Sequence, residues 1–143
     1  MYRSLTTLAA AGVLLAAVPV ADAAVTRTFD FRTGTSTTEG HAHAWGNVTF
    51  RGRHVSLTGR LNDVCPQDGM GAYLDVIVRF VGGGGDTRSF RDTGGCKDGD
   101  GIAFQFTAGG GSKPSNVELR LAERDANGGQ PPETRTLVVS NPS

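Results

Sequence analysis

GAYLDVIVRFVGGGG, residues 71–85, alternates apolar and polar side chains before it ends in four glycines. The residues of one parity are large and apolar: Leu74, Val76, Val78 and Phe80. The residues between them are Tyr73, Asp75, Ile77 and Arg79, and all of these except Ile77 carry a polar group. Because successive side chains of a β-strand point to opposite faces, this period predicts a strand with one buried and one solvent-facing side. The glycine run predicts a turn after it.

The same period recurs along the rest of the chain. Seven further stretches show it clearly or weakly: VTRTFDF (25–31), HAHAWGNVTF (41–50), RHVSLTGRL (53–61), DTRSFRD (86–92), GIAFQFTAGGG (101–111), SNVELRLAERD (115–125) and ETRTLVV (133–139). Residues 117–129 also contain good helix formers, but their strict alternation favours a strand. About eight strands, each with one apolar face, predict an all-β, single-domain antiparallel β-sandwich. A closed β-barrel is the alternative.

The first 24 residues, MYRSLTTLAAAGVLLAAVPVADAA, resemble an export signal in their layout. Arg3 gives a basic start, residues 5–20 are apolar, and Ala21-Asp22-Ala23 has the small-x-small pattern of a cleavage site. A membrane anchor is disfavoured because a spanning helix needs roughly 20 apolar residues. We therefore expect a signal peptide over residues 1–23 and a secreted, extracellular domain over residues 24–143.

The amino-acid composition limits the kinds of partner that we expect this domain to bind. The chain has 14 Lys and Arg and 14 Asp and Glu residues, a formal net charge of +0. Such a balance gives no long-range attraction to nucleic acid or to an anionic membrane. We expect no nucleic-acid partner and no membrane span in the mature chain. The 21 glycines lie at breaks between apolar runs and have no three-residue period, which argues against collagen.

Two cysteines, Cys65 and Cys96, are the only ones in the chain. An even count in an exported protein predicts one disulfide bond. The C-x-x-C spacing of redox proteins is lacking, so a structural role is expected. Closing a loop of about 30 residues stabilises a fold by roughly 3–4 kcal/mol in the chain-entropy model.

Residues 37–61 hold all three histidines and the only tryptophan. His41 and His43 point the same way in a strand and could form two ligands of zinc or copper, although no third ligand is evident. The alternative is a pair of solvated histidines. Trp45 falls on the same polar face if the alternation continues through Gly46. A bulge at Gly46 would instead turn Trp45 into the core.

An exposed Trp45 would offer a flat ring on which a sugar can stack. Tyr73 also lies on a polar strand face, and Arg51, Arg53 and Asp75 could supply hydrogen bonds. These five residues are the predicted ligand-binding set.

Two short stretches weakly resemble calcium loops. Asp98-Gly-Asp100-Gly and Asp125-x-Asn127-Gly128 place oxygen atoms at alternate positions, but neither completes an EF-hand. Asp-Gly and Asn-Gly pairs are also ordinary turn residues. We expect no cofactor, with calcium left open beside the zinc or copper pair at His41 and His43.

Motifs for catalysis are lacking: the chain has no nucleophile elbow and no H-E-x-x-H. The leading hypothesis is a small secreted, non-catalytic binding or structural protein that engages carbohydrate or another cell-envelope component. One alternative is a small extracellular hydrolase using His41 or His43. The other is a purely structural or protein-binding module.

Overall fold

The computed structural model describes residues 22–34, 40–64, 70–94, 99, 101–125 and 133–142. The predicted disulfide, most of the predicted signal peptide, and most of the calcium candidates lie outside these residues: Cys65, Cys96, residues 1–21, Asp98, Asp100, Asn127 and Gly128. Those predictions stay open.

The described residues form eight strands, and each one covers a stretch that the alternation predicts. They are β1 (Val25–Arg32), β2 (His41–Arg51), β3 (His54–Val64), β4 (Met70–Phe80), β5 (Gly85–Asp92), β6 (Ile102–Gly109), β7 (Pro114–Asp125) and β8 (Glu133–Ser140). The choice of a strand over a helix for β7 is confirmed. No helix in the described part of the chain has the length and apolar character needed to cross a membrane.

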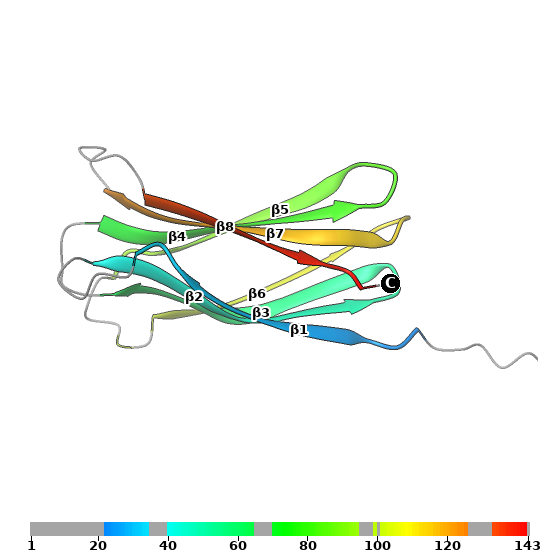
Figure 1. Ribbon diagram of the computed structural model, residues 1–143, viewed down its shortest axis with the longest axis horizontal. Helices are drawn as coiled ribbons and strands as arrows, with labels where there is room; N and C mark the ends of the chain where they lie inside the picture. Colours follow the sequence, from blue (N-terminus) through cyan, green and yellow to red (C-terminus); the bar gives the residue numbers. More distant parts are fainter. Residues whose placement is uncertain are drawn as a thin grey trace, which may run out of the picture.

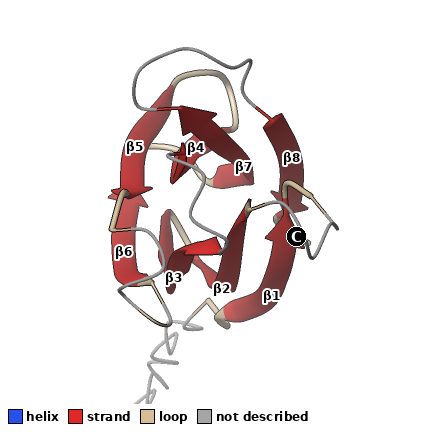
Figure 2. Cartoon of the chain, turned by 90° about the vertical axis from the view of Figure 1, so that its left-hand side faces the viewer, coloured by secondary structure: helices blue, strands red, loops and turns tan. Residues whose placement is uncertain are grey.

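The strands form two antiparallel sheets of four strands that stack face to face (Figure 1). Sheet A has the order β1-β2-β3-β6, and sheet B has the order β5-β4-β7-β8. Viewed along the strands, β1 and β8 lie on one open side and β5 and β6 on the other (Figure 2). The sheets are not closed into a barrel, so the β-sandwich prediction is confirmed and the barrel alternative is wrong.

The core consists of the apolar side chains at alternate positions of each strand, which point toward the opposite sheet. Leu74, Val76 and Val78 of β4 are fully buried, as are Leu119 and Leu121 of the neighbouring β7. Burying each such side chain stabilises the fold by about 1.5–3 kcal/mol. The opposite parity of β4, with Tyr73 and Asp75, lies on the outer face of sheet B. Strand alternation therefore decides which side chains can reach a ligand.

A pair of glycines lies at the centre of sheet A. Gly46 of β2 is directly opposite Gly59 of β3, and both occupy core-facing positions. The rings of Phe29 and Phe104, from the two edge strands, lie over this pair and stack with centroids 6.4 Å apart. The lack of side chains at Gly46 and Gly59 thus makes room for two aromatic rings, the close approach that glycine in a strand commonly indicates.

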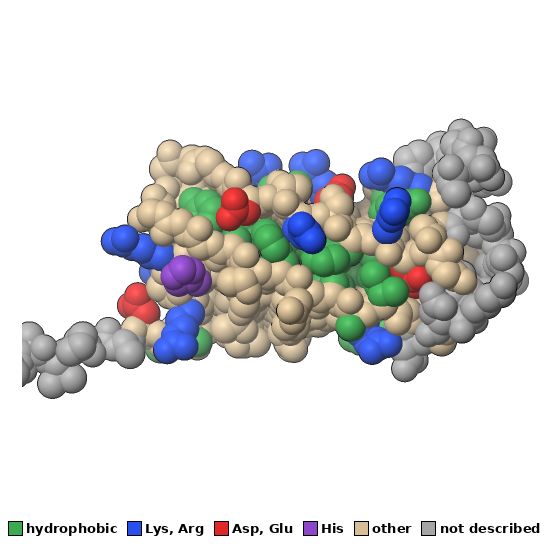
Figure 3. Space-filling view, turned by 180° about the vertical axis from the view of Figure 1, so that it is seen from behind, with side chains coloured by type: hydrophobic (Ala, Val, Ile, Leu, Met, Phe, Trp, Pro, Cys, Tyr) green, Lys and Arg blue, Asp and Glu red, His purple; other side chains and the backbone are tan. Residues whose placement is uncertain are grey.

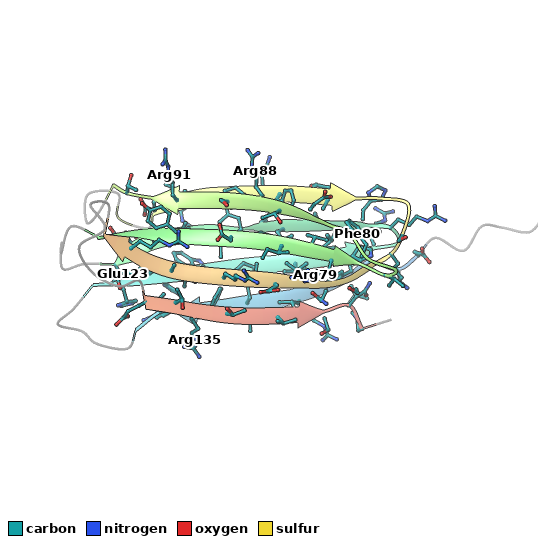
Figure 4. The ribbon with its side chains drawn as sticks, turned by 90° about the horizontal axis from the view of Figure 1, so that it is seen from above. Arg79, Phe80, Arg88, Arg91, Glu123 and Arg135 are labelled. Carbon is teal, nitrogen blue, oxygen red and sulfur yellow. The ribbon has the colours of Figure 1, made fainter. Side chains whose placement is uncertain are left out.

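Strand β5 is an edge of sheet B and is strongly charged. Arg88 is paired in register with the buried Val76 and so takes a core-facing position, yet it is exposed because the sandwich is open on this side. It projects from the edge together with Arg91 (Figure 4). From behind, apolar side chains line the gap between the two sheets on the β5–β6 side (Figure 3). Charges at such an edge discourage pairing with other chains.

Candidate binding site

Trp45 lies on the outer face of sheet A, as the uninterrupted alternation requires. The register between β2 and β3 runs through Gly46 without a shift, so the bulge considered as an alternative is not formed. The indole is half-buried, and its ring packs against that of His43 with centroids 4.5 Å apart and planes 30° apart. One face of the indole is therefore occupied by a neighbouring side chain.

The two histidines of β2 have different surroundings. His43 lies 2.8 Å from Asp30 of β1, measured from Nε2 to Oδ1. His41 is only 7% exposed, and both of its ring nitrogens are buried without a hydrogen-bond partner. Burial lowers the pKa of His41, and the charges of Arg32 and His43 lower it further against the opposing effect of Glu133. The fold thus favours a neutral His41.

The predicted metal pair finds no third ligand in the part of the chain that the structure describes. No group of three His, Cys, Asp or Glu residues there is placed to hold a metal ion. His41 and His43 are neighbours on one strand, but His43 is engaged with Asp30. The arrangement of the described side chains does not favour a zinc or copper site at these two residues.

Arg51 and Arg53 lie at the tight turn between β2 and β3, at one end of the sandwich. They line a hollow of about 720 Å³ whose other walls come from the chain entering β1 and from the outer faces of β2, β3 and β6: Asp22, Ala24, Thr49, Gly52, His54, Ser56 and Thr107. Asp22 lies before the expected cleavage point after Ala23. Export with cleavage would remove that wall, so this hollow is a weak candidate for the mature protein.

Tyr73 and Asp75 occur together in a second hollow, on the outer face of sheet B. Its volume is about 380 Å³, and it is lined by Tyr73, Asp75, Ser89, Phe90, Arg91 and Arg124. Pockets for small ligands commonly measure about 300–1,000 Å³. We call this site the Tyr73 hollow. It combines an aromatic ring, a carboxylate, a hydroxyl and two guanidinium groups, a set suited to an amphipathic ligand.

Strand register builds the Tyr73 hollow. In the β4–β5 hairpin, Tyr73 is opposite Arg91 and Asp75 is opposite Ser89. The Ser89 hydroxyl donates a 2.6 Å hydrogen bond to Oδ1 of Asp75, which fixes the carboxylate. On the other side, the guanidinium carbon of Arg124 from β7 lies 5.5 Å from the centre of the Tyr73 ring, a cation–π distance. Figure 4 looks onto this face of sheet B.

The five predicted ligand-binding residues therefore fall into three separate places. Trp45 is on the outer face of sheet A, Arg51 and Arg53 are at the β2–β3 turn, and Tyr73 and Asp75 are on the outer face of sheet B. A small ligand at Tyr73 cannot also stack on Trp45, because the core of the sandwich separates the two rings. Tyr73 and Asp75 share one hollow, and Arg51 and Arg53 share another.

Sequence reasoning missed four contributors to the hollow: Ser89, Phe90, Arg91 and Arg124. A signal for two of them existed, because a hairpin over the glycine run puts Arg91 and Ser89 beside Tyr73 and Asp75. Predicting that placement requires the exact length of the turn, because a slip of one residue in the pairing moves every side chain to the other face. Arg124 depends on β7 pairing with β4, which local sequence does not reveal.

The chain matches no protein-family model, no curated protein and no solved structure in the three comparisons made. The candidate site therefore rests on its own geometry.

Proposed function

We propose that the protein is a non-catalytic binding protein that engages carbohydrate through the Tyr73 hollow. The observation that carries the proposal is the grouping of Tyr73, Asp75, Ser89 and the two arginines in one depression on an open sheet face. The apolar face of a sugar ring can lie on an aromatic side chain. Its hydroxyl groups can donate to Asp75 and accept from the guanidinium groups.

The position of the hollow also suits a polymeric ligand. It lies on the outer face of a sheet, where an elongated glycan could extend along the strands beyond the depression itself. Export, which the first 23 residues predict, would bring the protein to the cell envelope and its polysaccharides. We propose a secreted location on that ground.

The alternative of a hydrolase using His41 or His43 finds less support in the structure. Neither histidine lines the Tyr73 hollow or the hollow at Arg51 and Arg53. His41 is buried, and the ring of His43 packs on Trp45. Binding at sheet B therefore remains the proposal that the described geometry favours.

Retention of the purified protein on immobilised cell-wall polysaccharides, followed by affinity measurement on those retained, tests the proposal. We expect Tyr73→Ala to weaken binding about tenfold or more, since stacking and ring burial are lost, and Tyr73→Phe to keep most of it. Trp45→Ala is the matched control, because it removes an aromatic ring from the opposite face. Loss of binding in Trp45→Ala but not in Tyr73→Ala would place the site on sheet A and overturn the proposal.

A further inference from the structure

On the outer face of sheet B, ion pairs between arginines and carboxylates are concentrated in one half of the face. In the half of the face away from Tyr73, Glu118 of β7 contacts both Arg79 of β4 and Arg120 of its own strand. The hydrogen bond from Arg120 lowers the pKa of Glu118, and that from Arg79 adds to the effect. Two arginines of this face are thus satisfied by one carboxylate.

Among the described side chains, the two arginines beside Tyr73 have no such partner. Neither Arg91 nor Arg124 forms an ion pair with a carboxylate among the residues that the structure describes. Arg124 instead lies over the ring of Tyr73. Both side chains are exposed, and both line the same hollow. None of the described carboxylates therefore competes with a ligand for their guanidinium groups.

Among the described residues, Asp75 supplies the only carboxylate of the hollow, and Ser89 rather than an arginine holds it. The described lining therefore includes two arginines, one on each of the strands that flank β4, and one carboxylate. A guanidinium group binds carboxylate or phosphate through two parallel hydrogen bonds. Asp75 in turn accepts from sugar hydroxyls but repels a second anionic group.

We infer that the Tyr73 hollow takes an acidic glycan, in which a sugar ring lies on Tyr73 and its carboxylate or phosphate group binds Arg91 or Arg124. This inference rests on the proposed function and names its ligand class. A nucleic acid is a poorer fit, because Asp75 lies beside the arginines and the chain has no net positive charge with which to attract a phosphate backbone.

Three polymers separate the sources of the anionic group: polygalacturonic acid, its methyl ester, which keeps the backbone but not the charge, and a phosphate-linked polymer of hexopyranose rings. Affinity is measured by titration calorimetry on the intact mature protein. We expect at least one acidic polymer to bind more tightly than the methyl ester, and its affinity to fall with added salt. The tighter of the two acidic polymers identifies the anionic group.

Arg91→Gln and Arg124→Gln each test one arm of the site. At least one of the two should lower affinity for the acidic polymer about tenfold, the usual effect of losing a charged hydrogen bond, and leave affinity for the methyl ester nearly unchanged. Arg79→Gln, on the same face but paired with Glu118, is the matched control and should bind as the wild type does.

The outcomes distinguish this inference from the proposed function. Equal binding of the acid and the ester, with no effect of the arginine variants, overturns the acidic ligand and leaves carbohydrate binding intact. If the protein binds neither these polymers nor other cell-wall polysaccharides, both the acidic ligand and the proposed carbohydrate binding are overturned. Tighter binding of a single-stranded oligonucleotide than of any polymer, lost in Arg91→Gln and Arg124→Gln, overturns the glycan assignment in favour of a nucleic acid.

Discussion

The backbone N–H of Asp63 donates a hydrogen bond to Oδ2 of Asp92 over 3.1 Å, and both residues are buried. Asp63 lies at the end of β3 in sheet A, and Asp92 ends β5 in sheet B. The other oxygen of Asp92 accepts from the N–H of Gly94, also at 3.1 Å. One carboxylate therefore joins the two sheets at this end of the sandwich and also holds the chain that leaves β5.

Replacing Asp92 should destabilise the fold markedly. In Asp92→Ala the N–H groups of Asp63 and Gly94 lose their acceptor, and a buried unsatisfied donor costs about 1–3 kcal/mol. We expect a loss of about 2–4 kcal/mol in the free energy of unfolding, measured by urea denaturation. Asp86→Ala, at an exposed position of the same strand, should change stability by less than about 0.5 kcal/mol. Equal effects of the two substitutions would show that the carboxylate does not hold the sheets together.

The Asp63–Asp92 hydrogen bond also bears on the predicted disulfide. Cys65 follows Asp63 by two residues and Cys96 follows Asp92 by four, so the chain leaves two adjacent strand ends just before each cysteine. Both cysteines lie outside the described residues, and the bridge stays a prediction. We expect Cys65→Ala with Cys96→Ala to lower the free energy of unfolding by roughly 3–4 kcal/mol.

Thiol labelling of the native exported protein decides whether that bridge exists. A bridged protein should react with a thiol reagent only after reduction and unfolding, and reduction alone should lower the melting temperature. Two cysteines that label readily in the unreduced native protein would show that the covalent link is lacking. The Cys-to-Ala pair should then melt like the wild type.

The strands could be predicted from the sequence because each one carries its own evidence. Leu74, Val76 and Val78 specify a buried face by their spacing alone, whatever the partners of β4 are. The site could not be predicted in the same way. Tyr73 and Trp45 both lie on outward faces, yet which sheet each face belongs to depends on strand order, and strand order comes from long-range pairing. Arg124 joins Tyr73 for that reason alone.

Gly59→Ala should be among the most disruptive single-methyl additions in the chain. A β-carbon at Gly59 would lie 2.4 Å from the carbonyl oxygen of Trp45 and 2.8 Å from the ring of Phe104. The first contact is with backbone, which cannot move without disturbing the β2–β3 pairing. Overpacking of this kind costs about 1–3 kcal/mol, and we expect a loss at the upper end of that range in chemical denaturation.

Gly111→Ala is the control for that substitution. A β-carbon there would contact nothing within 4 Å, so stability should stay within about 0.5 kcal/mol of the wild type. If Gly59→Ala were equally harmless, the close packing of Phe104 against the glycine pair would be wrong.

Acidification should destabilise the protein through His41. Burial lowers the pKa of His41 below its ordinary value of 6.5, so the unfolded chain binds this proton more readily than the folded protein does. Stability is therefore fully present above pH 6.5 and is lost as the pH falls below that value. His41→Leu removes both the titration and two buried nitrogens that lack partners. The variant should lose less stability than the wild type between pH 7.5 and pH 5.5, measured by urea denaturation at each pH.

His54→Leu, which replaces an exposed histidine at the start of β3, should retain the pH dependence of the wild type. If His41→Leu also retains it, the acid sensitivity arises from another group.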